Sequence, residues 1–534
     1  MIKRLALGIC LILNVCSCGR PSSTARPMEN LQPTPTPPLG LPAALPTASA
    51  AGLPTTTPAS GFSPHGPFLA FQDDPDQPKK ITLFDPIQRD SLELFKPAGD
   101  ILKWDAGGLS PDGQYLAYYS GRLDPLTDPS AAPAVPQQIE LNIMRTVDGS
   151  IVYQKSLLNK DYPQIFLQAA QSIIAAPPAD FGVQDNSRNA LASALLASFN
   201  AFIYTNSWSS DGHTLAFASG SDGPSSDVYT YDLDTRALRR ITDGPSEVYK
   251  IMWSPDGKSI LNSGTYFVGE GMCGTWYLSA ADGSGSWGFS VKGTVDAGLI
   301  RGCDFNEWVS DHQALVFEDA NGRGIYNLEL MDINKKSIEL IWPHNFHSFA
   351  FDPVGQQAYV STEGEQQQNN TYFQQGTYQV DLASHKTVSI GRDMLSLTYL
   401  GWGGGETIAG IPGDAADICF LPTNSCSGFP DTGQKQFSGL SVSATRTNLV
   451  MYSDTGLWHI ISDLAGLQVT RDENGGVKAV IWSPNPDSDP ASDLELVLSN
   501  SLPMSYSLNN PVTGHNNPLP GFSGLNFQGW FWRK

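Results

Sequence analysis

Residues 253–264 read WSPDGKSILNSG, and close variants of this phrase recur along the chain. Pro presets a turn backbone, Asp bonds amides just downstream of it, and Gly adopts the positive φ that closes a short hairpin. Each copy therefore predicts a β-hairpin with an aromatic residue at the end of its first strand. The other copies are FSPHGPFLAFQD from Phe62, LSPDGQYLAYYSG from Leu109, WSSDGHTLAFASG from Trp208, WVSDHQALVFED from Trp308 and FDPVGQQAYVST from Phe351.

Each hairpin is followed by two more strand-like runs. Residues 228–233 (VYTYDL) and 238–242 (LRRIT) follow the copy at Trp208, for example. Four short strands per unit of about 45 residues predict one blade of a β-propeller. Weaker anchors lie at 402, 442 and 482, which brings the number of anchors to nine. Because propellers rarely exceed eight blades, we expect about eight with one false anchor, while seven or nine stay open.

The interval between the anchors at 109 and 208 is about one unit too long. Residues 160–202 within it have helical apolar spacing and helix-forming composition. We expect a helical insertion between blades, with a degenerate blade as the alternative. At the other end, residues 525–532 (LNFQGWFW) form a lone aromatic strand. It predicts ring closure, because this strand would complete the blade that begins near Phe62 and would remove an exposed edge.

The phrase SPDG followed by an apolar run resembles the WD-like repeat of TolB-type propellers, which also occurs in the propellers of the prolyl oligopeptidase family. The resemblance covers most of residues 61–534 and is strongest from 62 to 320. It implies an all-β propeller and says little about activity. A prolyl oligopeptidase would also need a hydrolase domain with a G-x-S-x-G nucleophile elbow, and the sequence contains no such motif.

The first residues indicate export. Lys3 and Arg4 precede an apolar run that is too short for a membrane-spanning helix and ends in small residues. Val-Cys-Ser-Cys at its end resembles a bacterial lipobox, which implies acylation of Cys18. Cys16 is the weaker alternative, and an ordinary signal peptide over residues 1–18 is another. Acyl chains would hold the protein on a membrane, so we expect an extracytoplasmic lipoprotein in the periplasm or at the cell surface of a bacterium.

Residues 19–60 are rich in Pro, Thr, Ser and Ala and have no periodic apolar face. Repeated Pro favours extended polyproline conformation over helix or sheet, so this segment is interpreted as a disordered tether. The globular part is then 61–534. The chain has 53 acidic and 32 basic residues and a formal net charge of −21. Such a surface repels phosphate backbones, which makes a nucleic-acid partner improbable.

Four cysteines lie beyond the signal region, and an even number in an exported protein suggests disulfides. Proximity favours Cys273–Cys303 and Cys419–Cys426, with other pairings and free thiols as alternatives. The second bond would close a Pro-Thr-Asn-Ser loop. The cysteine spacing does not fit a zinc site, and the sequence gives no metal site and no cofactor.

Other candidate groups are weaker. His344 and His347 form the only close histidine pair and are interpreted as loop residues. The acidic stretch 487–493 lacks the glycine and closing glutamate of a calcium loop, so a solvated turn is expected. The loops around Cys273 and Cys303 mix aromatic and charged residues that could bind a ligand. The candidate ligand-binding residues there are Trp276, Trp287, Arg301, Asp304 and Glu307.

These observations favour a membrane-tethered binding or interaction module with a protein, peptide or glycan ligand. A propeller enzyme, such as a glycan or peptide hydrolase or lyase with acidic residues on the central face, is the alternative. A sensor or assembly partner in the manner of TolB is a third hypothesis, although no segment here matches the partner-binding segment of that protein.

Overall fold

The computed structural model describes residues 66–531, apart from 123–137, 176–201, 266–274, 291–302, 429–438 and a series of shorter segments. The predicted signal peptide, Cys18 and the tether therefore lie outside the described residues. Within the described part, the strands form nine four-stranded antiparallel sheets. We number them sheet 1 to sheet 9 in chain order. No helix of the described part is long and apolar enough to cross a bilayer.

Sheet 1 combines strands from both ends of the chain, whereas sheets 2 and 3 each consist of four consecutive strands. Sheet 1 consists of β1 (Phe68–Gln72), β2 (Ile81–Asp85), β3 (Asp90–Phe95) and β38 (Asn526–Phe531). Sheet 2 consists of β4 (Asp100–Lys103), β5 (Tyr115–Arg122), β6 (Gln138–Arg145) and β7 (Ile151–Ser156). Sheet 3 consists of β8 (Asn206–Trp208), β9 (Thr214–Ser219), β10 (Asp227–Asp232) and β11 (Leu238–Arg240).

The next three sheets follow in the same order of strands. Sheet 4 consists of β12 (Glu247–Trp253), β13 (Ser259–Thr265), β14 (Thr275–Ala280) and β15 (Ser286–Ser290). Sheet 5 consists of β16 (Cys303–Trp308), β17 (Gln313–Glu318), β18 (Tyr326–Asp332) and β19 (Ser337–Phe346). Sheet 6 consists of β20 (Ser348–Asp352), β21 (Gln357–Thr362), β24 (Gly376–Asp381) and β25 (Thr387–Gly391), and a small hairpin of β22 (Glu365–Gln366) and β23 (Tyr372–Phe373) lies between β21 and β24 in the chain.

The last three sheets repeat the pattern. Sheet 7 consists of β26 (Met394–Tyr399), β27 (Ile408–Pro412), β28 (Asp417–Leu421) and β29 (Ser425–Gly428). Sheet 8 consists of β30 (Gly439–Val442), β31 (Asn448–Ser453), β32 (Gly456–Asp463) and β33 (Gly466–Asp472). Sheet 9 consists of β34 (Val477–Trp482), β35 (Glu495–Ser499), β36 (Tyr506–Asn510) and β37 (His515–Pro518).

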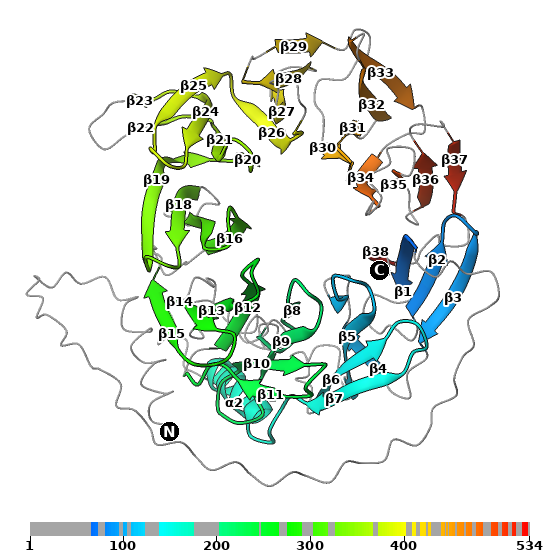
Figure 1. Cartoon of the computed structure of the whole chain (residues 1–534), viewed down its shortest axis with the longest axis vertical. Helices are drawn as coiled ribbons and strands as arrows, with labels where there is room; N and C mark the ends of the chain where they lie inside the picture. Colours follow the sequence, from blue (N-terminus) through cyan, green and yellow to red (C-terminus); the bar gives the residue numbers. More distant parts are fainter. Residues whose placement is uncertain are drawn as a thin grey trace, which may run out of the picture.

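The sheets follow one another around a ring, with one edge of each sheet at the centre (Figure 1). Nine hydrophobic clusters of the described residues each join two consecutive sheets. Strand β9 shows how the sequence achieves this. Leu215 and Phe217 pack toward sheet 2, while Ala216 and Ala218 pack toward sheet 4. A strand that is covered on both faces must be apolar at every position, which explains the short continuous apolar runs.

The SPDG turn has the roles that its sequence predicts. Ser254 Oγ donates to Asp256 Oδ1 at 2.7 Å, and Asp256 Oδ1 accepts the Lys258 amide at 3.0 Å. Gly257 has a φ of 68°, the left-handed region that glycine adopts without strain. The copies at Ser110 and Ser209 repeat the same bonds. The motif is therefore a turn, and its exposed residues Asp256 and Lys258 form an ion pair with each other at 3.1 Å.

The anchor tryptophans join neighbouring sheets. The indole N–H of Trp253 donates to the Ser207 carbonyl at 2.9 Å, and that of Trp208 donates to the Gly108 carbonyl at 2.8 Å. Trp530 in β38 makes the equivalent bond to the Ile481 carbonyl of sheet 9, at 3.1 Å. Strand β38 also pairs antiparallel with β1. The aromatic strand near the carboxyl end is thus part of sheet 1, as the sequence predicts.

The described residues form nine sheets where the sequence favoured about eight. The first strands of sheets 8 and 9 end at the weak anchors, Val442 and Trp482. The first strand of sheet 7 ends at Tyr399, and the weak anchor at 402 lies outside the described residues. In these copies the Pro-Asp-Gly turn is degenerate, but the apolar second strand is retained and packs on both sides. Burial between sheets, which cannot be read from the turn residues, shows that the weak anchors at 442 and 482 each belong to a four-stranded sheet.

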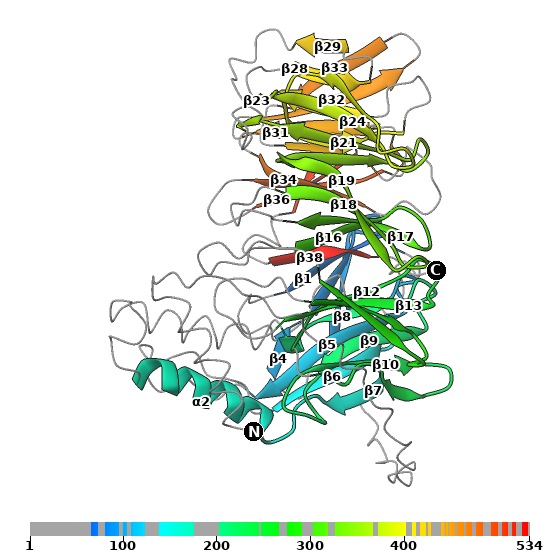
Figure 2. The same cartoon turned by 90° about the vertical axis from the view of Figure 1, so that its left-hand side faces the viewer.

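Helix α2 (Tyr162–Ala175) lies between sheets 2 and 3, within the stretch where the sequence predicts an insertion. Asn159 makes the turn that leads into it, because its side-chain oxygen accepts the amides of Asp161 and Tyr162 at 2.8 Å each. The side chains of Tyr162, Phe166 and Ala170 are buried against sheets 2 and 3. Figure 2 shows the helix on one side of the ring. Residues 176–201 of the predicted insertion lie outside the described residues.

Candidate functional site

The strand directions divide the molecule into two faces. In each antiparallel sheet the turns after the first and third strands lie on one face, which we call the turn face. The connections after the second strand and between sheets lie on the opposite face, which we call the connection face. Most of the longer intervals between strands begin and end at strand ends on the connection face, namely 123–137, 157–205, 266–274, 291–302 and 363–375. The exceptions, 104–114 and 483–494, begin and end at strand ends on the turn face. Helix α2 and strand β23 lie on this same side of the ring (Figure 2).

The first strands of six sheets carry a β-bulge near the connection face. At each bulge the pairing with the second strand skips one residue, which is left without a partner in the ladder. The skipped residues are Leu102, Tyr249, Asn306, Leu395, Lys478 and Gln528. Bulges are frequent beside binding sites because they redirect a side chain. Of these residues, Leu395 and Lys478 have described side chains, and both are exposed.

Glu247 begins the first strand of sheet 4 and is buried, with 8 % of its surface exposed. Its Oε2 accepts the phenolic O–H of Tyr162 at 2.5 Å and the amide of Ser226 at 2.8 Å. Burial raises the pKa of Glu247 to about 7, against these two hydrogen bonds, which favour the charged form. The ring of Tyr162 covers the carboxyl group, and Tyr162 is itself 0 % exposed. The group therefore holds the insertion on the ring and is out of reach of a substrate.

Asp227 extends this cluster toward the rim. Its carboxylate accepts hydrogen bonds from Arg240 at 2.6 Å, from the Thr242 hydroxyl at 3.0 Å and from the Gly244 amide at 3.2 Å. Burial raises the pKa of Asp227 above its usual range, although the Arg240 guanidinium opposes this. All of these partners belong to sheet 3 or to the segment that leads into sheet 4. The arrangement fixes the connection between the two sheets.

A second polar cluster joins sheets 6 and 7 on the connection face. Asp393 accepts the hydroxyl of Ser361 at 2.7 Å and the amide of Gln375 at 3.1 Å, and His347 Nε2 lies 3.2 Å from its carboxylate. The hydrogen bond to Asp393 raises the pKa of His347, although its partial burial opposes this. Burial opposes ionisation of Asp393, but bonds from His347 and Ser361 outweigh it and lower the pKa.

This Ser, His and Asp set does not have the order of a catalytic triad. In a triad the serine hydroxyl donates to histidine and the carboxylate orients the far side of the ring. Here the hydroxyl of Ser361 donates to Asp393, and Ser361 is 0 % exposed. Its Oγ also accepts the Met394 amide at 2.6 Å, which ties the end of β21 to the start of β26. The cluster therefore links sheet 6 to sheet 7 by hydrogen bonds.

The structure places one of the paired histidines differently from the sequence interpretation. His344 lies in strand β19, with its ring stacked on Phe373 at a centroid distance of 3.6 Å. His347 lies between β19 and β20 and bonds Asp393. The prediction of a loop residue was wrong for His344, because β19 extends through Phe346 and the ring of Phe373 stacks on His344. His347 lies in the connection between the two strands, as predicted. Among the described residues no group of three potential metal ligands is found.

Four of the five candidate ligand-binding residues lie in strands and not in loops. Trp276 is in β14, Trp287 in β15, and Asp304 and Glu307 in β16. The prediction of a loop was wrong at these positions because TWYLS, SWGFS and CDFNEW pair in the ladders of sheets 4 and 5. Their side chains, together with Arg301, lie outside the described residues. A ligand-binding role for them stays a prediction.

One predicted disulfide is present. Cys419 and Cys426 are bonded, with a Cα–Cα distance of 4.0 Å. They do not close an irregular loop, because they stand directly opposite each other on the paired strands β28 and β29. Cys303 begins β16, but Cys273 lies outside the described residues, so the second pairing stays a prediction. In the acidic stretch, Asp493 is 1 % exposed and accepts a hydrogen bond from Asn448 at 3.0 Å. It is a structural residue and not a solvated one.

Sequence reasoning missed Tyr162, Glu247 and the Ser361–Asp393–His347 cluster. Their partners are far apart in the chain, so no local spacing brings them together. One signal was available for Glu247 and Asp393. Each is an acidic residue that directly precedes or begins the apolar first strand of a sheet, where a carboxylate can accept amides from the neighbouring connection.

No family model matches the chain. A stretch of 64 residues is 45 % identical to part of the "Uncharacterized peptidase YuxL" of Bacillus subtilis (strain 168), and the match covers 12 % of this chain and 9 % of that protein. The chain thus spans less than a tenth of the curated relative that it matches.

Among solved structures, a eukaryotic initiation factor is similar with a TM-score of 0.47 and 12 % identity, over 88 % of this chain and 98 % of that chain. TolB from Acinetobacter baumannii is similar with a TM-score of 0.27 and 16 % identity, over 61 % of this chain and 63 % of that chain. The propeller-type fold is assigned from the sheets and sheet interfaces of the chain itself.

Proposed function

We propose that the chain is a closed nine-bladed β-propeller that binds a protein, peptide or glycan on its connection face. We further propose that acyl chains on Cys18 anchor it to a bacterial membrane, outside the cytoplasm. The observation that carries the binding function is the gathering of most long connections on this face, together with the bulges of six first strands beside it. Loops on a rigid scaffold are the usual place of a binding site.

Two acidic residues at this face, Glu247 and Asp393, support binding over catalysis. Glu247 is enclosed by Tyr162, and Asp393 is saturated by Ser361, Gln375 and His347. A general acid or base must reach the proton that it transfers, and these carboxyl groups have protein donors in that place. Recognition by exposed residues of this face, such as Gln374, Leu395 and Lys478, fits the geometry better than acid–base chemistry by these groups.

Site-specific photo-crosslinking tests the binding face. A photoreactive residue would replace Gln374, which is exposed in the connection between β23 and β24, and in a second variant Val354, which is 85 % exposed on the turn face of the same sheet. Irradiation of cells that express the full chain should give a discrete adduct from position 374 and none from position 354. Adducts of equal yield at both positions, or at neither, would contradict the proposal.

Membrane fractionation tests the anchor separately. The Cys18→Ser variant should lose membrane association, because no acyl chain would then be attached. A Cys16→Ser variant serves as the matched control and should partition like the unchanged chain. If the Cys18→Ser variant still sediments with membranes, the anchor is assigned wrongly, whatever the crosslinking shows.

A further inference from the structure

The disulfide of sheet 7 is asymmetric. Cys419 lies on β28 and is 0 % exposed, whereas Cys426 lies on β29 and is exposed. Strand β29 is the last strand of its sheet, so the Cys426 side of the bond is at the rim of the ring. A thiol from solution therefore meets the sulfur of Cys426 before that of Cys419.

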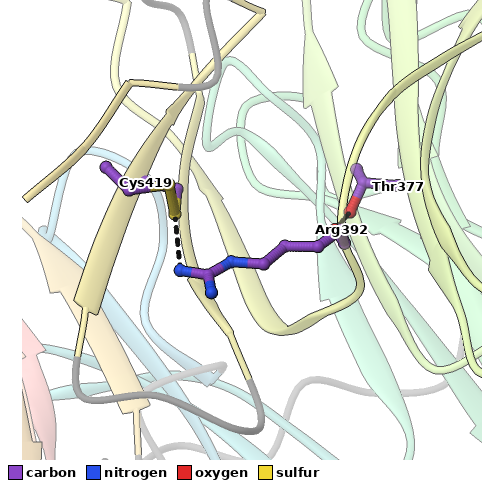
Figure 3. Close-up of a disulfide and its surroundings, with 4 residues drawn as sticks. Thr377, Arg392 and Cys419 are labelled. Atoms are coloured by element: carbon purple, nitrogen blue, oxygen red, sulfur yellow. Dashed lines mark hydrogen bonds between the residues drawn. A yellow bond between two sulfur atoms is a disulfide. The ribbon is translucent and has the colours of Figure 1, made fainter.

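The buried sulfur has a cationic neighbour. The guanidinium Nη2 of Arg392 lies 3.5 Å from Cys419 Sγ, within hydrogen-bond distance for sulfur (Figure 3). Arg392 comes from the connection between β25 and β26, on the adjoining sheet. Its backbone is held in place because its carbonyl accepts the Thr377 hydroxyl at 2.7 Å. The backbone from which this side chain extends is thus held by a contact that does not involve the disulfide.

Exposure and charge act in the same direction. In thiol–disulfide exchange a thiolate attacks one sulfur, and the other sulfur leaves as a thiolate. A buried thiolate is unfavourable unless a positive group stabilises it, and a nearby arginine lowers the pKa of a cysteine thiol. Attack at the exposed Cys426 makes Cys419 the leaving group, beside Arg392. Attack at Cys419 would require entry into the core and would leave the thiolate on Cys426, away from this contact.

We propose that Cys426 is a thiol-modification site, at which a low-molecular-weight thiol opens the Cys419–Cys426 bond in one direction. The thiolate forms a new sulfur–sulfur bond with Cys426, the Cys419–Cys426 bond breaks, and its electron pair leaves on Cys419 Sγ, beside Arg392. The number of disulfide bonds is unchanged in this step. A second thiolate then releases Cys426 and forms the oxidised dimer of the small thiol, which completes a two-electron reduction of the protein.

The position of the bond limits the effect of the exchange. Cys419 is on an inner strand that pairs with both β27 and β29, whereas β29 pairs with β28 alone in the described ladder. Opening the bond therefore loosens the outer strand beside the cluster of sheets 6 and 7, to which Cys419 belongs. The cluster between sheets 7 and 8 contains neither cysteine. Strand β29 ends where the connection 429–438 begins, on the connection face. The modification would act at one border of that face.

Intact-mass and peptide mass spectrometry of the full chain test the direction. The oxidised protein is incubated with reduced glutathione, quenched with an alkylating reagent and digested. The proposal requires glutathione on Cys426 and the alkyl group on Cys419 in the early product. Glutathione on Cys419, or equal amounts on both residues, would overturn it. So would the absence of any adduct at this pair when the thiol is in large excess.

Variants at Arg392 test the charge. Replacing Arg392→Gln should slow glutathionylation of Cys426 about tenfold, because the thiolate that leaves on Cys419 would lose the cation that stabilises it. Arg392→Lys should restore most of the rate, which a purely structural role of the residue would not predict. Arg239→Gln, on the exposed rim of sheet 3, is the matched control and should react like the unchanged chain. Equal rates in all four proteins would refute the role of Arg392. If a variant fails to fold, the choice of cysteine that carries glutathione in the unchanged chain is an independent test.

Discussion

Tyr162 donates its hydroxyl to the carboxyl group of Glu247, 2.5 Å away, although the two residues belong to the inserted helix and to the first strand of sheet 4. Both side chains are buried, and the Ser226 amide supplies a second hydrogen bond to the same oxygen. One carboxyl group therefore joins three segments: the insertion, the connection within sheet 3 and the innermost strand of the next sheet.

The ionisation of Glu247 should make stability depend on pH. Its pKa is raised from 4.5 to about 7 in the folded chain, so the folded state binds the proton more tightly than the unfolded state. Its contribution is therefore fully present below pH 4.5 and is lost as the pH rises through 7, by about 3 kcal/mol in total. We expect Glu247→Gln to remove this pH dependence. Urea unfolding from pH 5 to 8, for both proteins, measures it; parallel curves would contradict the prediction.

The approach of helix α2 to the ring depends on a glycine. A Cβ at Gly220 would lie 2.8 Å from the ring of Tyr162, closer than carbon atoms approach in proteins. Gly220→Ala should therefore displace the helix and destabilise the chain by about 1–3 kcal/mol. Faster hydrogen exchange of the α2 amides would report the displacement. Gly285→Ala is the control, because a Cβ there meets no atom within 4 Å; unchanged exchange in Gly220→Ala would show that the contact is not limiting.

The Ser361–Asp393–His347 cluster between sheets 6 and 7 should lose stability when the charge of Asp393 is removed. In Asp393→Asn one oxygen becomes an amide donor that faces the donors Ser361, Gln375 or His347, so we expect a loss of about 2 kcal/mol. The pKa of His347, raised in the native chain by this carboxylate, should fall toward 6.5. Imidazole NMR signals of the labelled protein would follow the titration.

The pH dependence of the His347–Asp393 ion pair provides a control for this prediction. The raised His347 pKa contributes stability below pH 6.5 that is lost as the pH rises through the folded value, and the lowered Asp393 pKa contributes stability above pH 3.8 that is lost as the pH falls. The pair thus stabilises most between these limits. Asp393→Asn should differ least from the native chain outside them; a constant difference at all pH values would argue against the ion pair.

The bond of Trp530 to sheet 9 should contribute as much as its counterpart elsewhere in the ring. Trp530→Phe removes the indole donor to the Ile481 carbonyl, and Trp253→Phe removes the donor to the Ser207 carbonyl. Each change should cost about 1–2 kcal/mol of unfolding free energy in urea. If Trp530→Phe had no effect while Trp253→Phe did, β38 would contribute little to holding sheets 1 and 9 together.

The sequence predicts the local features well because their causes are local. Ser254, Asp256 and Gly257 make their turn with neighbours a few residues away, so the turn can be read in the motif itself. The number of sheets was harder to predict, because the turns after 400 and 442 lack the motif. Only the packing between sheets defines these two sheets. The Glu247 and Asp393 clusters could not be predicted, because their partners lie 85 and 32 residues away in the chain and meet only when consecutive sheets are assembled.

Sheet 1 combines β38, near the carboxyl end, with three strands from the first hundred residues. Ribosomes make the amino end first, so this sheet cannot be completed until residue 531 has been synthesised and delivered. Until then the inner edge of β1 has no neighbour, and pairing across so long a separation is slow. Biogenesis of this protein therefore includes an interval in which eight sheets can be assembled and the ninth waits for its last strand, and during this interval a chaperone or a second chain could compete for the open edge.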